Sequence, residues 1–138
     1  MTQTSPASAT RPLRILVVDD DGGVRALLCD ILRAEGHEVF EVVDGAEAVR
    51  WMQSHPTCNL VVTDLCMPEK EGFELIQELR SKYAELKIIC ISGRFGGRLL
   101  SAATKLGADA ALPKPLNVVQ FLELVEKLVP NRLKARPG

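Results

Sequence analysis

Residues 14–23 read RILVVDDDGG, an aliphatic run that ends in three consecutive acids and then two glycines. After the glycines, apolar residues recur at the spacing of one helical face, namely Val24, Leu27, Leu28, Ile31 and Leu32. Gly36 follows them at a position where helices commonly end. The stretch therefore predicts a strand over residues 14–20 followed directly by a helix.

The same order of strand and helix repeats four more times along the chain. Short runs rich in aliphatic residues predict further strands over 37–43, 60–63, 87–92 and 109–112. A segment with helical spacing follows each of these runs. Strands joined through helices need crossover connections, which are right-handed and cover both faces of a parallel sheet. The sequence therefore predicts an α/β fold with a doubly wound (βα)5 open parallel five-stranded sheet.

Length and composition limit the number of domains and the kinds of partner. The 138 residues suit a single compact domain, which we expect over 13–130. Residues 1–12 are expected to form a disordered lead, and 131–138 a short basic tail. The formal net charge of -1 offers no general positive field for nucleic acid. Every apolar run is far shorter than the roughly 20 residues that cross a bilayer, so no membrane segment is expected.

The cysteines and histidines show no ligand or redox spacing. Four cysteines occur without a CxxC pair, namely Cys29, Cys58, Cys66 and Cys90, which is typical of free thiols in a reducing cytosol. We therefore expect a cytoplasmic protein. His37 and His55 stand at the ends of predicted elements and are expected to be solvated or to cap a helix.

Polar residues gather where the predicted strands end. The first strand is followed by Asp19, Asp20 and Asp21, the third ends at Asp64, the fourth at Ser92, and Lys114 follows the fifth. Ligands of open α/β sheets bind beyond these carboxyl ends. Two carboxylates 4 Å apart repel by about 4 kcal/mol at an effective dielectric near 20, so a cluster of them needs a cation. Oxygen ligands favour a hard divalent ion, Mg²⁺ foremost.

Helix capping is the simpler interpretation of the three consecutive acids. Acids are favoured at helix N-termini, and a turn from strand to helix often carries one. We expect Asp21 to take this role. Asp64 and Lys114 are expected at the ends of other strands, close to the three acids. Their presence favours a role for Asp19 and Asp20 in a binding site rather than in capping.

The arrangement resembles the receiver domain of bacterial two-component response regulators, of the single-domain chemotaxis-regulator kind. The similarity covers Leu13 to about Pro130 and is carried by four motifs: VVDD at 17–20, TDLCMPEKEG at 63–72, ISG at 91–93 and GADAALPKP at 107–115. The resemblance implies a flavodoxin-like fold and a phosphoacceptor function that depends on Mg²⁺.

By this resemblance, Asp64 receives the phosphoryl group, while Asp20 holds the metal directly and Asp19 holds it largely through water. The backbone carbonyl of Cys66 completes the protein ligands, and Ser92 and Lys114 contact the phosphoryl oxygens. A cis peptide bond is implied before Pro115. Cys66 and Arg94 occupy the positions that tune phosphoryl hydrolysis in this family. The implied partners are a sensor histidine kinase or phosphotransfer protein and an output protein, with a homodimer left open.

One position departs from the chemotaxis type of receiver. An aromatic residue commonly stands three positions before the lysine and rotates inward on activation, but this chain has Ala111 there. The loop over 92–97 contains Gly93, Gly96 and Gly97 and could carry the signal instead. The departure concerns the relay of the signal rather than phosphorylation.

Two other functions compete with this interpretation. A pseudo-receiver would share the fold and act as a docking module without phosphorylation. A haloacid-dehalogenase-type phosphatase would use Asp19 as nucleophile and Asp21 as acid/base, but it needs a later acidic pair that the chain does not supply after Lys114. The sequence therefore favours a phosphoacceptor that is not an enzyme acting on external substrates, apart from phosphorylating and dephosphorylating itself.

Overall fold

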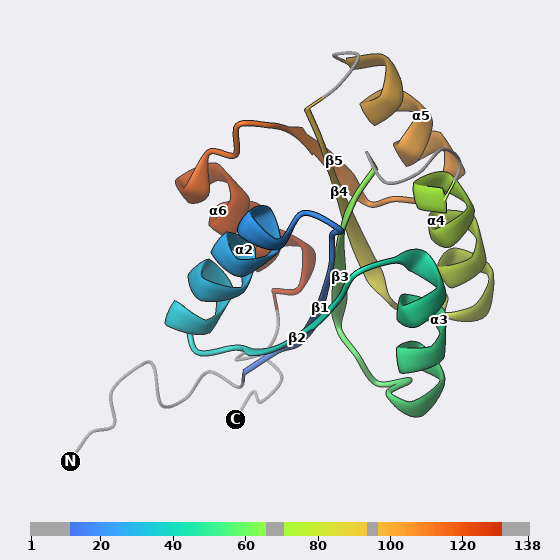
Figure 1. Ribbon diagram of the computed structural model, residues 1–138, viewed down its shortest axis with the longest axis horizontal. Helices are drawn as coiled ribbons and strands as arrows, with labels where there is room; N and C mark the ends of the chain where they lie inside the picture. Colours follow the sequence, from blue (N-terminus) through green and yellow to red (C-terminus); the bar gives the residue numbers. More distant parts are fainter. Residues whose placement is uncertain (1–11, 66–70, 94–96, 131–138) are drawn as a thin grey trace.

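A computed structural model describes residues 12–65, 71–93 and 97–130, which form one sheet between two layers of helices (Figure 1). The strands are β1 (Arg14–Val18), β2 (Glu38–Val42), β3 (Leu60–Asp64), β4 (Lys87–Ser92) and β5 (Ala110–Pro113). The helices are α2 (Gly22–Ala34), α3 (Gly45–Ser54), α4 (Glu71–Lys82), α5 (Gly97–Leu106) and α6 (Val118–Leu128).

The sheet is fully parallel, with strand order β2-β1-β3-β4-β5. Helices α2 and α6 cover one face, and α3, α4 and α5 cover the other (Figure 1). This confirms the predicted doubly wound α/β fold. Among the described residues, no helix has the length and apolar character needed to span a membrane.

The central strands are buried on both faces, as their unbroken apolar runs predict. Ile15 and Val17 of β1 belong to a core cluster with residues of α2 and α6. Leu16 and Val18 point to the other face and belong to a second cluster with residues of α3, α4 and α5. Side chains alternate between the faces of a strand, so one short segment anchors both helical layers.

Aspartate side chains cap the N-termini of α2 and α3. The Asp21 side chain accepts hydrogen bonds from the backbone N–H groups of Gly23 and Val24 at the start of α2. Asp44 does the same for Glu47 at the start of α3. The prediction that Asp21 caps α2 is confirmed.

Strand β1 ends earlier than the sequence suggests. It stops at Val18, whereas the prediction extended it to Asp20. Asp19 keeps one link to the sheet, because its N–H donates to the carbonyl of Val42 at 3.3 Å. The chain must then turn within two residues so that Asp21 can cap α2, and this turn takes Asp20 out of the strand.

Both histidines and the described cysteines lie away from the acids that follow β1 and end β3. His55 is the C-cap residue of α3, and its Nδ1 lies 2.9 Å from the carbonyl oxygen of Trp51. The expectation that His37 is solvated is wrong, since it is buried and its Nδ1 accepts a hydrogen bond from Leu13 N–H. Of the four cysteines, the three within the described ranges, Cys29, Cys58 and Cys90, are free and buried.

Arg80 ties the end of α4 to the loop between α5 and β5. Its Nε donates to the carbonyl of Gly107 at 3.0 Å, and a terminal nitrogen lies 2.6 Å from Oδ2 of Asp109. Gly107 has a φ of 127°, and a Cβ there would lie 3.0 Å from Cβ and Cγ of Arg80. Only glycine fits this close approach without strain.

Candidate functional site

The polar residues singled out in the sequence meet at the carboxyl ends of neighbouring strands. Asp19 and Asp20 follow β1, Asp64 ends β3, Ser92 ends β4 and Lys114 follows β5. These four strands are adjacent in the sheet, so residues far apart in sequence lie side by side. We call this group of five residues the acidic pocket.

Strand register sets how these residues face one another. Val18 pairs with Thr63, so the residues that follow, Asp19 and Asp64, leave the β1 and β3 ends at the same level. Ser92 pairs with Pro113 on the next two strands. The N–H of Lys114 then donates to the carbonyl of Ser92 at 3.0 Å, which fixes the start of the lysine side chain beside the pocket.

The side chains converge within bonding distance. The Nζ of Lys114 lies 3.2 Å from Oδ2 of Asp64 and 3.9 Å from Oδ2 of Asp19. One carboxylate oxygen from each of Asp19, Asp20 and Asp64 lies within 4.8 Å of the other two. Three carboxylates thus share a small volume with one ammonium group.

Burial divides the pocket into a floor and a rim. Asp19, Asp64 and Ser92 are only 1%, 4% and 2% exposed, whereas Asp20 is exposed to solvent. Buried charges are stable only when they are paired or bind a cation. The arrangement gives a ligand access from the Asp20 side and little water beneath it.

The pKa of Asp19 records this environment. This pKa is raised from 3.8 to about 6; burial is the largest cause, and the neighbouring carboxylates of Asp64 and Asp20 also contribute. The hydrogen bond from Asp21 N–H and the Lys114 ammonium act in the opposite direction. Removal from water is therefore the main feature of the Asp19 environment, and a buried carboxylate of this kind is stabilised by a cation.

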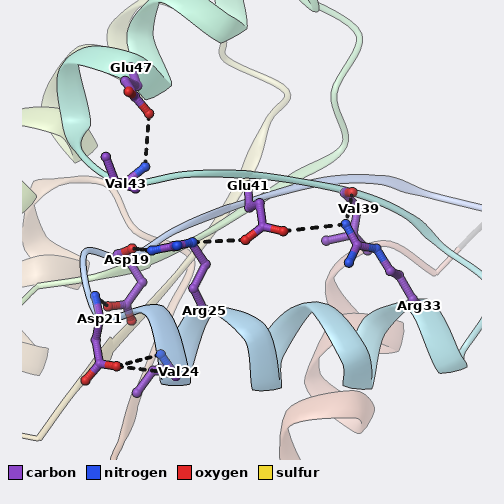
Figure 2. A network of polar contacts seen from close by, with 10 residues as sticks. Asp19, Asp21, Val24, Arg25, Arg33, Val39, Glu41, Val43 and Glu47 are labelled. Atoms are coloured by element: carbon purple, nitrogen blue, oxygen red, sulfur yellow. Dashed lines mark hydrogen bonds and ion pairs between the residues drawn. The ribbon is translucent and has the colours of Figure 1, made fainter.

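Asp19 makes three hydrogen bonds besides its contact with the pocket, and Figure 2 shows the two with Asp21 and Arg25. Its Oδ1 accepts from Asp21 N–H at 2.8 Å, and its own N–H donates to Val42. Its carbonyl oxygen accepts from a terminal nitrogen of Arg25 at 2.8 Å. Arg25 was not among the predicted site residues; the signal for it in the sequence is a cation in the first turn of α2, where a helix disfavours positive charge.

The remaining predicted residues fall into three groups. The peptide bond between Lys114 and Pro115 is cis, the conformation that the resemblance implies. Ala111 lies on β5, pairs with Cys90 and is half-buried, with no aromatic ring at that position. Cys66 and Arg94 lie outside the described residues, so the metal-ligand role of the Cys66 carbonyl and their roles in hydrolysis stay predictions.

The position of Asp21 argues against the phosphatase alternative. A haloacid-dehalogenase-type reaction would need its carboxylate free to act as acid or base next to Asp19. Instead, its Oδ1 accepts hydrogen bonds from Gly23 N–H at 2.9 Å and Val24 N–H at 3.1 Å. This carboxylate serves the helix rather than the pocket.

Known proteins with this sequence pattern and fold are response regulators. The family model described as response regulator receiver domain matches residues 15–126. The chain is 34% identical to the transcriptional regulatory protein PdtaR of Mycobacterium tuberculosis, over 91% of this chain and 61% of the relative. It is 36% identical to the response regulator MprA of a Mycobacterium species, over 86% of this chain and 51% of the relative. The chain thus spans only about half to three fifths of these relatives.

Solved structures agree with the sequence relatives. A CheY-like response regulator receiver domain protein from Methanospirillum hungatei superposes with a TM-score of 0.79 at 28% identity, covering 91% of this chain and 100% of that one. The chemotaxis response regulator CheY4 of Vibrio cholerae gives 0.76 at 26% identity, covering 86% and 99%. The match in sequence over residues 15–126 and the match in fold lead to one conclusion: this chain belongs to the response regulator receiver domain family.

Proposed function

We propose that this receiver domain is a Mg²⁺-dependent phosphoacceptor that takes a phosphoryl group on Asp64 and thereby changes its affinity for a partner. The observation that carries the proposal is the contact between the Lys114 ammonium and the buried Asp64 carboxylate, beside two further carboxylates. A nucleophilic carboxylate next to a cation and a metal site is the arrangement that phosphoryl transfer requires.

The residues present fit a hard divalent cation. Asp19, Asp20 and Asp64 would hold it, since all three offer oxygen ligands within a small volume. Lys114 contacts Asp19 and Asp64 and offsets part of their charge. When bound, the ion supplies positive charge that neutralises the pocket and the oxygens of an incoming phosphoryl group. The exposed position of Asp20 leaves room for water among its ligands.

The chain's own residues then act as follows. A carboxylate oxygen of Asp64 attacks the phosphorus of a phosphohistidine or small acyl-phosphate donor, forming an acyl phosphate while the donor's leaving group departs with the bonding electrons. Lys114 moves its contact from the carboxylate to the phosphoryl oxygens, and the Ser92 hydroxyl donates a hydrogen bond to them. Because these contacts differ between the two states, they provide the differential energy that a population shift needs.

The partners follow from this chemistry. A sensor histidine kinase or a phosphotransfer protein would donate the phosphoryl group, and an output protein would read the surface formed by α5, β5 and α6. The chain would catalyse its own phosphorylation and dephosphorylation and no reaction of an external substrate. A phosphorylation-independent docking module is the alternative that the following experiment separates.

The test is intact-mass analysis after incubation with acetyl phosphate, with Mg²⁺ or with EDTA. We expect one added phosphoryl group on the wild type in Mg²⁺ and none in EDTA. Asp64→Asn should remain unmodified, whereas Asp30→Asn, which changes an exposed carboxylate on α2, should behave as the wild type. Unmodified wild-type protein with both acetyl phosphate and a cognate donor would favour the docking module, and modification of Asp19 would favour the phosphatase.

A further inference from the structure

Arg25 links the acidic pocket to the edge strand of the sheet. One terminal nitrogen donates to the carbonyl oxygen of Asp19 at 2.8 Å, and Nε donates to Oε1 of Glu41 on β2 at 2.9 Å (Figure 2). The Arg25 side chain is 21% exposed, and its contact with the Asp19 carbonyl is partly shielded from water, whereas its contact with Glu41 is exposed. The guanidinium thus joins α2, β2 and the residue that follows β1 at one point.

The position of Arg25 is unfavourable for the helix that carries it. Its backbone N–H donates to the carbonyl of Asp21 in the first turn of α2, and no acidic residue lies in that turn. A positive charge there opposes the helix dipole, whose positive end lies at the N-terminus. Residues that break a local rule in this way are expected at functional sites.

The bond from Arg25 acts on the peptide group between Asp19 and Asp20. That peptide carries the carbonyl that Arg25 holds, and its N–H belongs to Asp20. The side chain of Asp20 is exposed and, within the part of the chain that the structure describes, makes no hydrogen bond of its own. Its direction therefore depends on the backbone that precedes it.

We propose that Arg25 is a positioning residue of the acidic pocket: by holding the Asp19 carbonyl, it aims the Asp20 carboxylate at Asp64 and so sets the affinity of the pocket for a divalent cation. The inference rests on the metal site of the proposed function. It goes beyond that function because Arg25 is neither a ligand nor in contact with Asp64.

The same helix offers a matched control in Arg33. Arg33 also faces Glu41, with a terminal nitrogen 3.9 Å from Oε2, but its hydrogen bond goes to the carbonyl of Val39 at 2.9 Å (Figure 2). It therefore shares the charge, the helix and the acidic neighbour of Arg25, and it lacks the contact with Asp19. Any effect of charge removal alone should appear in both arginine variants.

The experiment measures Mg²⁺ affinity by isothermal titration calorimetry on wild type, Arg25→Met and Arg33→Met, each shown to be folded by circular dichroism. We expect Arg25→Met to bind Mg²⁺ about tenfold more weakly, because loss of a residue that orients a ligand has effects of this size. Arg33→Met should stay close to the wild type. Arg25→Gln, whose side chain is too short to span both contacts, replaces Arg25→Met if that variant does not fold.

A second measurement separates positioning from a general structural effect. In the acetyl phosphate reaction, the Mg²⁺ concentration that gives half of the maximal rate should rise by the same factor in the Arg25 variant. The rate at saturating Mg²⁺ should stay close to the wild-type rate, which a general disturbance of the pocket would not allow.

The outcomes distinguish the two proposals. Wild-type affinity in the folded Arg25 variant, or an equal loss in Arg33→Met, overturns the role of Arg25 and leaves the metal site intact. A wild type that binds no Mg²⁺ overturns the metal site itself, and the role of Arg25 with it.

Discussion

The Nζ of Lys114 lies 3.2 Å from Oδ2 of Asp64, joining the end of β5 to the end of β3 across the intervening strand β4. The Asp64 side chain is 4% exposed and that of Lys114 is 26% exposed, so the pair is partly shielded from solvent. Lys114 also lies 3.9 Å from Asp19. One ammonium group therefore moderates the charge of two buried carboxylates.

Replacing this lysine should change the titration of Asp19. Lys114 lowers the pKa of Asp19, which is about 6 in its presence. In Lys114→Met we therefore expect the Asp19 pKa to lie above its wild-type value, because two carboxylates then share the buried floor without a cation. Carbon-detected NMR titration of the carboxyl groups measures it, with Lys105→Met on the outside of α5 as the control. An unchanged Asp19 pKa would contradict the pairing.

Asp19 should make the metal-free protein less stable as the pH rises. Its pKa is about 6 in the folded chain against an ordinary value of 3.8, so the folded state binds more protons between these values. Stability therefore falls as the pH increases from about 4 to 6, and the loss is complete above the folded pKa, at about 3 kcal/mol if this group acts alone. In EDTA at pH 7.5, Asp19→Asn should be more stable than the wild type by about 1–3 kcal/mol.

Urea unfolding at pH 4 and pH 7.5 checks this expectation. The gain from Asp19→Asn should be present at the higher pH and largely absent at the lower one, where the wild-type carboxyl is protonated. Asparagine preserves the acceptor for Asp21 N–H, so the turn after β1 is retained. A variant that is less stable than the wild type at pH 7.5 would show that burial is not the main contribution to the environment of Asp19.

Asp20 should affect metal binding without affecting the metal-free fold. Its side chain is exposed, and surface substitutions of this kind change stability by about 0.5 kcal/mol or less. We expect Asp20→Asn to unfold as the wild type does in EDTA. Mg²⁺ at about 100 times its dissociation constant should stabilise the wild type by about 2.7 kcal/mol and the variant by much less. Thermal unfolding with and without Mg²⁺ compares them, and equal shifts would remove Asp20 from the metal ligands.

Alanine substitutions at two glycines with positive φ should distinguish the cost of backbone strain from the cost of a steric clash. Gly36 has a φ of 91°, and a Cβ added there would meet no atom within 4 Å, whereas a Cβ on Gly107 would lie 3.0 Å from Arg80. Gly36→Ala should therefore lose about 1–2 kcal/mol through strain alone. Gly107→Ala should lose a further 1–3 kcal/mol, about the effect of overpacking, since Arg80 is fixed by its bonds to Gly107 and Asp109. If urea unfolding gave the same loss of stability for both variants, the Arg80 side chain would be able to move away from the added Cβ at no cost.

The strands and helix starts could be predicted because their signals are local. The unbroken apolar runs at Ile15 and Ile88 identify strands buried on both faces, and Asp21 and Asp44 mark helix starts through bonds to residues two or three positions away. The end of β1 could not be predicted in the same way. Asp19 and Asp20 leave the strand because the chain turns there to bring Asp21 to the start of α2. The position of this turn depends on where α2 packs against the sheet.

The meeting of the pocket residues could be predicted because parallel strands end at one edge. To predict that Asp19, Asp64 and Lys114 lie close together, it was enough to know which strand each of them follows or ends. The contacts of Arg25 and His37 could not be predicted from the strand order. Arg25 reaches the carbonyl of Asp19, and His37 reaches the N–H of Leu13, and each of these backbone groups lies outside the element of the side chain that reaches it. Helical or strand spacing carries no information on such a contact.

The strand order also decides when the pocket can exist during folding. Asp20 and Asp64 are brought together only by the pairing of β1 with β3, after β2 and two helices have been passed along the chain. A cation that needs both carboxylates finds no site in a chain where this pairing is absent. A transition state that lacks this pairing would gain nothing from the cation, so bound metal would slow unfolding of the finished domain and leave its rate of folding nearly unchanged. The order of the strands thus makes the pocket a site that only the paired sheet can offer.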